Sequence, residues 1–231
     1  MNFPILSTII FLPLLASLFI FLSRNENNKS AIYVSLFSTI ANFFLALFLW
    51  YSFDKNYNGF QFIEESDWIS GFIKFKLGID GISVLFIVLT AFITPICIIS
   101  CVNSINVRVK EFLIAILILE TFMLGVFCSL DLIIFYLFFE AGLIPMFLII
   151  GVWGGARRVY SAFKFFLYTL LGSILMLVAI ISIYWITGTT DVLEIYEIKI
   201  PKEYQKLLWL AFFSSFAVKM PMWPVHTWLP D

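Results

Sequence analysis

Long apolar stretches separated by short polar connections dominate the chain. An α-helix needs about 20 apolar residues to cross a bilayer. The pattern therefore predicts a single membrane domain over residues 1–231 with about seven membrane-spanning helices. They are expected at Phe3–Leu22, Ala31–Phe53, Gly81–Val102, Phe112–Leu130, Leu132–Trp153, Tyr160–Thr187 and Leu207–Met220. The predicted fold class is an all-α, polytopic transmembrane helix bundle, because helices satisfy their own backbone groups in lipid.

The connections between these stretches are mostly tight, which favours antiparallel neighbours. Two connections are longer. Residues 54–80 are polar, and the alternation around Lys74-Phe75-Lys76 predicts a short hairpin or a surface-lying segment before the third span. Residues 188–206 mix acidic and basic side chains, and we expect them on the side opposite to the tight basic loops.

Basic residues in the tight loops predict the orientation of the chain. They follow the first, third and fifth spans: Arg24, Lys29, Arg108, Lys110, Arg157 and Arg158. Short cytoplasmic loops of membrane proteins carry an excess of Lys and Arg. All three loops fall on one side if the N-terminus is outside, so we expect them in the cytoplasm or the organelle matrix.

Composition supports the membrane assignment, because 62% of the 231 residues are hydrophobic and only 13% are charged. Soluble domains carry about 25% charged residues. The formal net charge of -1 lacks the basic excess of nucleic-acid-binding proteins, so the lipid bilayer is the expected surrounding and no nucleic acid is expected as a partner. Cys97 and Cys101 are four residues apart, but no other metal-ligating residue is near them in sequence. We expect buried thiols and no metal site.

Four polar side chains interrupt the apolar stretches and carry the candidate chemistry. Glu120 and Glu140 lie near the middle of the fourth and fifth predicted spans, and Lys219 lies in the last one, with His226 just beyond it. A charge in hydrocarbon is costly, so it normally faces a bundle interior or a watery path and has a partner. Pro145 predicts a kink beside Glu140, because proline cannot donate to the carbonyl of Ala141.

Lys219 lies about 12 residues into its predicted helix, roughly 18 Å along the axis. Pro221 is expected to leave the carbonyl of Ala217 unpaired, and Pro224 to do the same for Met220. Irregular backbone at membrane depth survives only inside protein or against a watery cavity. Histidine binds and releases protons near neutral pH, which suits His226 to a relay.

Two interpretations of these residues follow from the sequence. Glu140 and Lys219 form either a structural ion pair that fixes helix packing or a pair that moves ions or protons. Glu120 is either a relay group or a structural partner, and His226 either a relay group or a satisfied polar side chain. Moving one charge against 100 mV costs about 2.3 kcal/mol, so joining and separating an acid and a base is enough to drive a proton.

Four segments carry a family resemblance: GIDGIS at 78–83, FFEAGLIPMF at 138–147, IGVWGG at 150–155 and AVKMPMWPVHTWLPD at 217–231. In them the chain closely resembles the subunit M family of proton-pumping NADH:quinone oxidoreductase (respiratory complex I), the counterpart of mitochondrial NADH dehydrogenase subunit 4. The first two spans match only in kind. The resemblance implies an antiporter-like bundle with a broken seventh helix, the break falling at residues 221–224.

The resemblance also implies roles for the four residues. Glu140 and Lys219 match the glutamate and lysine of the family's proton-translocation pair, and Glu120 and His226 match proposed relay positions more weakly. No cofactor or metal is implied in this chain. NADH, flavin, iron–sulfur clusters and quinone are expected in partner subunits, with neighbouring antiporter-like subunits as membrane partners. The implied location is the bacterial or mitochondrial inner membrane.

The resemblance covers about half of the helices that the family is expected to have, because the chain ends at Asp231, inside a motif. The C-terminal half, with the other half-channel, is therefore expected to be absent. Two rivals remain from the sequence: a subunit of a multisubunit cation/proton antiporter, and a structural membrane subunit.

Overall fold

The computed structural model describes residues 4–23, 28–69, 73–102 and 104–230. Phe3, Arg24 and Asp231, on which parts of the sequence predictions rest, lie outside these residues. The chain divides into two compact units. The first contains the chain up to Ser66 together with Phe75–Ser129, and the second contains Asp67–Lys74 together with the chain from Leu130 onward.

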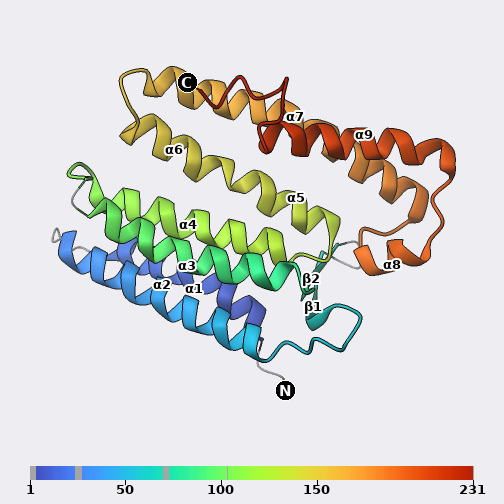
Figure 1. The fold of residues 1–231 in the computed structure, drawn as a ribbon, viewed down its shortest axis with the longest axis horizontal. Coiled ribbons are helices and arrows are strands. Elements are labelled where there is room, and N and C mark those ends of the chain that lie inside the picture. The colour runs from blue at the N-terminus through green and yellow to red at the C-terminus, as the bar shows by residue number, and fades with distance from the viewer. Residues whose placement is uncertain (1–3, 24–27, 70–72, 103, 231) are drawn as a thin grey trace. The chain divides into compact units, whose positions relative to one another are not determined.

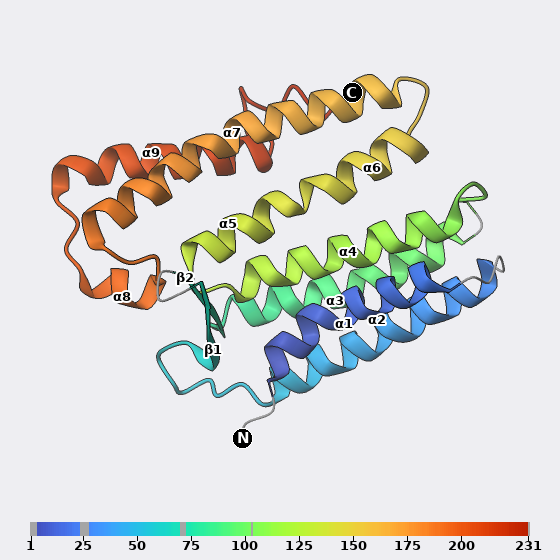
Figure 2. The same ribbon diagram turned by 180° about the vertical axis from the view of Figure 1, so that it is seen from behind.

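The first unit is built from four long helices. They are α1 (Ile5–Leu22), α2 (Asn28–Tyr51), α3 (Ser83–Cys101) and α4 (Val109–Cys128). Helix α1 packs on α2 and α4, and α3 packs on the same two helices. Both ribbon views show the four helices side by side, in blue to green (Figures 1 and 2). This arrangement buries one side of α2 and of α4, including Asn42 and Glu120.

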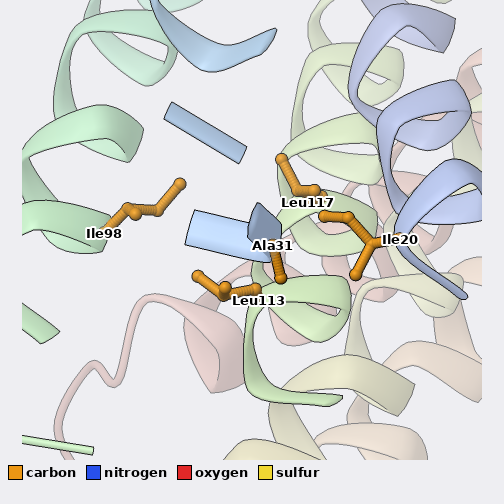
Figure 3. Packing of buried hydrophobic residues seen from close by; sticks show 5 residues of the cluster. All are labelled: Ile20, Ala31, Ile98, Leu113 and Leu117. Carbon is orange, nitrogen blue, oxygen red and sulfur yellow. The ribbon is translucent and has the colours of Figure 1, made fainter. Parts of the chain in front are cut away.

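A small apolar cluster holds one end of the first unit together. It joins side chains from all four helices, each at most 3% exposed: Ile20, Ala31, Ile98, Leu113 and Leu117. Figure 3 shows these side chains converging from their separate helices. Ala31 is the small member, and it leaves room for the larger aliphatic groups around it.

Two strands, β1 (Gln61–Ile69) and β2 (Ile73–Ile79), form a two-stranded sheet between α2 and α3. The predicted hairpin before the third span is therefore confirmed. Glu64 of β1 accepts hydrogen bonds from the backbone N–H groups of Leu6 (2.7 Å) and Ser7 (2.9 Å), and from the Ser7 hydroxyl. A carboxylate at a helix N-terminus satisfies donors that have no partner within the helix, so Glu64 caps α1 from a distant segment.

The second unit contains α5 (Leu132–Ala141), α6 (Leu143–Trp153), α7 (Arg158–Thr187), α8 (Val192–Glu197) and α9 (Lys202–Lys219). Helices α5 and α6 form one apolar stretch interrupted at Gly142, where the sequence predicts a kink. Pro145 follows three residues later and has no N–H to offer to the preceding turn. The interruption places Glu140 in the last turn of α5.

Helix α7 is the longest, with 30 residues, and it packs against α5, α6 and α9. Gly172 sits where α7 and α9 meet, because a Cβ added there would lie 2.9 Å from the Cβ of Val218. That separation is shorter than van der Waals contact, so only glycine allows this approach. Val218 precedes Lys219, so this close approach places the end of α9 that carries the lysine beside α7.

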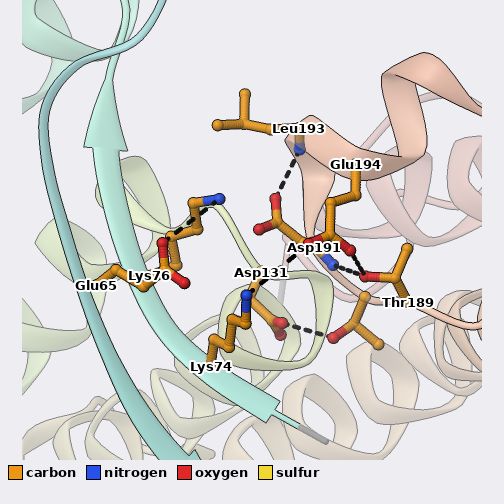
Figure 4. A network of polar contacts seen from close by, with 9 residues as sticks. Glu65, Lys74, Lys76, Asp131, Thr189, Asp191, Leu193 and Glu194 are labelled. Atoms are coloured by element: carbon orange, nitrogen blue, oxygen red, sulfur yellow. Dashed lines mark hydrogen bonds and ion pairs between the residues drawn. The ribbon is translucent and has the colours of Figure 1, made fainter. Parts of the chain in front are cut away.

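Aspartates begin two helices of the second unit. Asp131 accepts from the N–H groups of Ile133 (2.8 Å) and Ile134 (3.2 Å), and from the Thr190 hydroxyl at 2.5 Å. Asp191 caps α8 through the N–H of Leu193 at 2.8 Å. Figure 4 shows Asp131, and Asp191 bonded to Leu193, beside the ion pair between Lys74 and Glu194, whose charged atoms are 3.8 Å apart. The start of α5, the end of α7 and the start of α8 are thereby linked.

Six stretches of the described residues are long and apolar enough to cross a membrane: Ile5–Leu22, Asn28–Tyr51, Ser83–Cys101, Val109–Cys128, Leu132–Trp153 and Arg158–Thr187. The chain is a multi-pass membrane protein. Helix α9 is not among the six. It begins at Lys202, before the predicted start at Leu207, and Lys202, Glu203 and Lys206 make its first turns polar.

Candidate functional site

Glu140 lies half-buried at the end of α5 in the second unit. Its carboxylate interacts with the Ser173 side chain of α7 and electrostatically with the amine of Lys219. One carboxylate oxygen, Oε1, is buried and has no hydrogen-bond partner among the described residues. An unsatisfied buried acceptor beside a helix interruption is a place where a proton or a water molecule can bind.

Lys219 is the last residue of α9, the eighteenth of its 18 residues. Its amine donates a 2.6 Å hydrogen bond to the backbone carbonyl of Phe139 and lies 3.5 Å from the centroid of the Phe139 ring. A cation over an aromatic face, at a helix C-terminus, is electrostatically favoured. The structure thus brings Lys219 to the residue next to Glu140.

The Lys219 amine and the Glu140 carboxylate interact electrostatically, but they do not form a direct ion pair within 4.0 Å. The amine is held instead by the neighbouring carbonyl of Phe139. The two charges are therefore close enough to influence each other, and the amine must leave the Phe139 carbonyl to pair directly with the carboxylate. Both side chains come from the same compact unit.

The backbone after α9 corrects one prediction. The Ala217 carbonyl was expected to be unpaired because Pro221 has no N–H. It accepts instead from the N–H of Met222 at 2.8 Å, because the chain turns tightly enough for the residue after the proline to reach back. The Val218 carbonyl is also satisfied, by the indole N–H of Trp228 at 2.9 Å. Two carbonyls of the last turn are therefore paired near Lys219.

His226 is half-buried in the segment after α9, and its Nδ1 has no hydrogen-bond partner among the described residues. The backbone around His226 is held locally, since the His226 carbonyl accepts from the N–H of Leu229 and Trp228 packs on Phe165 with ring centroids 5.3 Å apart. No hydrogen bond joins its Nδ1 to Glu140 or Lys219. Its role as a relay stays a prediction.

Glu120 lies in the first unit, on α4, and is only 2% exposed. Its Oε1 accepts a 3.0 Å hydrogen bond from the amide of Asn42 on α2. Asn42 was missed by the sequence interpretation, although a lone amide in the middle of an apolar stretch is a signal that could have found it. Ser173 was missed as well, and single serines in membrane helices give no comparable signal because they often bond to their own backbone.

No group of three His, Cys, Asp or Glu side chains in the described ranges has a spacing suited to a metal ion. The polar groups around Glu140 include the Ser173 side chain, the Lys219 amine and the Phe139 carbonyl that accepts from that amine. Such a set holds and transfers protons, and it lacks the several anionic oxygens that hard divalent cations require.

Comparisons with known proteins now place the chain. Residues 129–231 match a family described as NADH:quinone oxidoreductase/Mrp antiporter, transmembrane. NADH-quinone oxidoreductase subunit M of Rhodobacter capsulatus is 51% identical over 98% of this chain and 47% of its own length. The chain belongs to this family of antiporter-like membrane subunits. The resemblance to the subunit M family predicted from the motifs is confirmed.

Other members of the family agree. NADH-ubiquinone oxidoreductase chain 4 of Marchantia polymorpha is 48% identical over 98% of this chain and 46% of its own length. The chain thus spans about half the length of the curated relatives it matches. A chain of respiratory complex I from Thermus thermophilus with bound NADH superposes with a TM-score of 0.84 at 28% identity, over 97% of this chain and 46% of its own.

A second structure supports the fold alone. It is the membrane-bound sulfane sulfur reductase, an archaeal respiratory membrane complex, with a TM-score of 0.82 at 24% identity. The match covers 98% of this chain and 36% of the matched chain of the reductase. The predicted antiporter-like helix bundle is confirmed, and the broken seventh helix, with its break at residues 221–224, stays a prediction.

Proposed function

We propose that this chain is a proton-translocating membrane subunit of an NADH:quinone oxidoreductase, in which Glu140 and Lys219 form the pair that moves the proton. The observation that carries the proposal is the Lys219 amine held on the Phe139 carbonyl, one residue from a carboxylate with an unpartnered buried oxygen. The family match over residues 129–231 includes both side chains.

The mechanism follows from the separation of the two charges. When Lys219 moves toward Glu140, the carboxylate stabilises the charged amine, and when it moves away, the amine loses that support and releases its proton. Glu140 and Lys219 lie at the ends of α5 and α9, where a small backbone shift changes their distance. His226 and Glu120 serve as relay groups in this proposal.

The partners are the other membrane subunits of the complex, including neighbouring antiporter-like subunits. NADH, flavin, iron–sulfur clusters and quinone belong to those partners, and the redox energy reaches this chain through conformational and electrostatic coupling. The location is a bacterial or mitochondrial inner membrane. The proposed orientation places the N-terminus outside, because the basic loops with Lys29, Lys110 and Arg157 then lie in the cytoplasm or matrix.

A Lys219→Met variant in the assembled complex tests the proposal. We expect NADH-driven acidification of inverted vesicles, followed with a pH-sensitive dye, to fall at least about tenfold, which is about 1.4 kcal/mol. The matched control is Lys206→Met, which removes an exposed cation from the same helix and should leave pumping unchanged. Normal pumping by an assembled Lys219→Met complex would support a structural subunit instead.

The second candidate function is a subunit of a multisubunit cation/proton antiporter. The family description, which names both NADH:quinone oxidoreductase and Mrp antiporter, favours it as the alternative. The two functions differ in their driving force. Proton flux that needs sodium or potassium and ignores NADH would favour the antiporter, whereas NADH-driven flux without either cation favours the oxidoreductase subunit.

A further inference from the structure

The first unit buries a polar pair that the proposed translocation pair does not include. Asn42 on α2 is 0% exposed and Glu120 on α4 is 2% exposed. The amide Nδ2 of Asn42 donates to Oε1 of Glu120 at 3.0 Å, across 78 residues of sequence. An amide that reaches a carboxyl group between two helices fixes the position of that carboxyl group.

Three atoms around this pair remain without a hydrogen-bond partner among the described residues. They are Oε2 of Glu120, Oδ1 of Asn42 and Oγ of Ser38, and all three are buried. Ser38 lies one helical turn before Asn42 on the same helix. Buried polar groups of native proteins are bonded to protein or to ordered water, so three such atoms together indicate a hydration site.

A groove of about 220 Å³ lies between α3 and α4, with Glu120 in its lining. Thr90 and Thr94 supply its hydroxyls, which donate to their own helix at 2.8 and 2.9 Å and keep lone pairs to accept from water. The other lining residues are apolar, except that Cys97 adds a thiol. The groove has room for several water molecules, since one occupies about 30 Å³ in the liquid.

We propose that Glu120, Asn42 and Ser38 form a hydrated site that exchanges protons with water in the α3–α4 groove. Asn42 is its positioning residue. Any use of this site during proton pumping rests on the proposed function. Hydration and proton exchange at Glu120 do not, because they are properties of the resting protein.

Infrared difference spectroscopy of the assembled complex tests this site directly. The carboxyl C=O stretch that disappears in Glu120→Gln identifies the group. In the unmodified complex we expect that band to move to lower frequency within minutes of transfer from H₂O to D₂O. A band that stays in place over hours, or no protonated carboxyl band at Glu120 at any pH, would overturn the hydrated site. Failure of the Lys219 test leaves this result unaffected.

The positioning role needs a variant of Asn42. Asn42→Leu has a similar shape and lacks the donor to Oε1, so the band should move to higher frequency. Asn42→Ser is the second variant and should shift the band in the same direction if Leu prevents assembly. Thr39→Val is the matched control, because Thr39 is buried on the same helix and bonds to the Ser35 carbonyl. An unchanged band in both Asn42 variants would overturn the role of Asn42.

Discussion

Glu120 and Glu140 sit in contrasting surroundings. Glu120 is 2% exposed in the middle of α4, and its carboxyl group accepts a hydrogen bond from the neutral amide of Asn42. Glu140 is half-buried at an interruption between two helices, with the cationic Lys219 within electrostatic range. The first acid is held in place by a fixed hydrogen bond, whereas the second faces a charge that is itself held by a different group.

The difference between the two sites shows which charged groups can change their separation most easily. Moving Glu120 away from Asn42 would break a buried hydrogen bond between two continuous helices, and α2 and α4 are also packed through a shared apolar cluster. Moving Lys219 relative to Glu140 requires only a shift at the end of α9 and at the Gly142 interruption. Packed cores resist continuous deformation, whereas helix ends adapt more easily.

The largest expected effect separates the two acids by activity. Glu140→Gln should lower NADH-driven proton pumping about tenfold, because Lys219 loses its counter-charge, while Glu120→Gln should lower it only about two- to threefold. The measurement is the initial rate of acidification in inverted vesicles, normalised to assembled complex on native gels. Equal losses at the two positions would remove the distinction drawn between the sites.

A second substitution tests the packing of α7 against α9, beside the Glu140–Lys219 pair. Gly172→Ala places a Cβ 2.9 Å from Val218 and must push α7 and α9 apart, at a cost of about 1–3 kcal/mol. Gly155→Ala is the control, because a Cβ there meets nothing within 4 Å. Thermal unfolding of the purified chain in detergent measures both. Similar melting temperatures for the two variants would show that α7 and α9 are not closely packed.

A smaller effect is expected at the start of α5, which carries Glu140 at its other end. Asp131→Ala removes the cap of α5 and the acceptor of the Thr190 hydroxyl, so we expect a loss of about 1–2 kcal/mol. Asp54→Ala removes an exposed aspartate that accepts from the N–H of Asn56 and should cost much less. The same melting assay ranks them, and the reverse order would contradict the capping role.

Most of the helices could be predicted from the sequence, because an apolar stretch long enough to cross a membrane marks the position of a helix. The prediction at 132–153 also included a kink, since Pro145 has a local and unavoidable backbone effect. The hairpin at 61–79 was readable from alternating residues. The start of α9 could not be read in the same way, because the charged residues Lys202, Glu203 and Lys206 precede the apolar stretch. The helix nevertheless begins there, directly after Pro201, and proline is compatible with a helix start.

The site was only partly available in the sequence. Charges in apolar stretches identified Glu120, Glu140, Lys219 and His226, because hydrocarbon makes each of them costly. Contacts across helices were not readable: the Asn42 amide, the Gly172 approach to Val218 and the reach of Lys219 to the Phe139 carbonyl depend on packing. The pairing of the Ala217 carbonyl with Met222 depends on the local turn, which proline alone does not specify.

A double-mutant cycle in proton pumping tests most directly whether Glu140 and Lys219 act as one unit. Glu140→Gln, Lys219→Met and the double variant would be compared in the assembled complex, with pumping rates expressed per NADH oxidised. The account predicts that the double variant pumps no more slowly than the slower single variant, because either change already disables the pair. Losses that multiply in the double variant would show that the two residues act independently and would contradict the account.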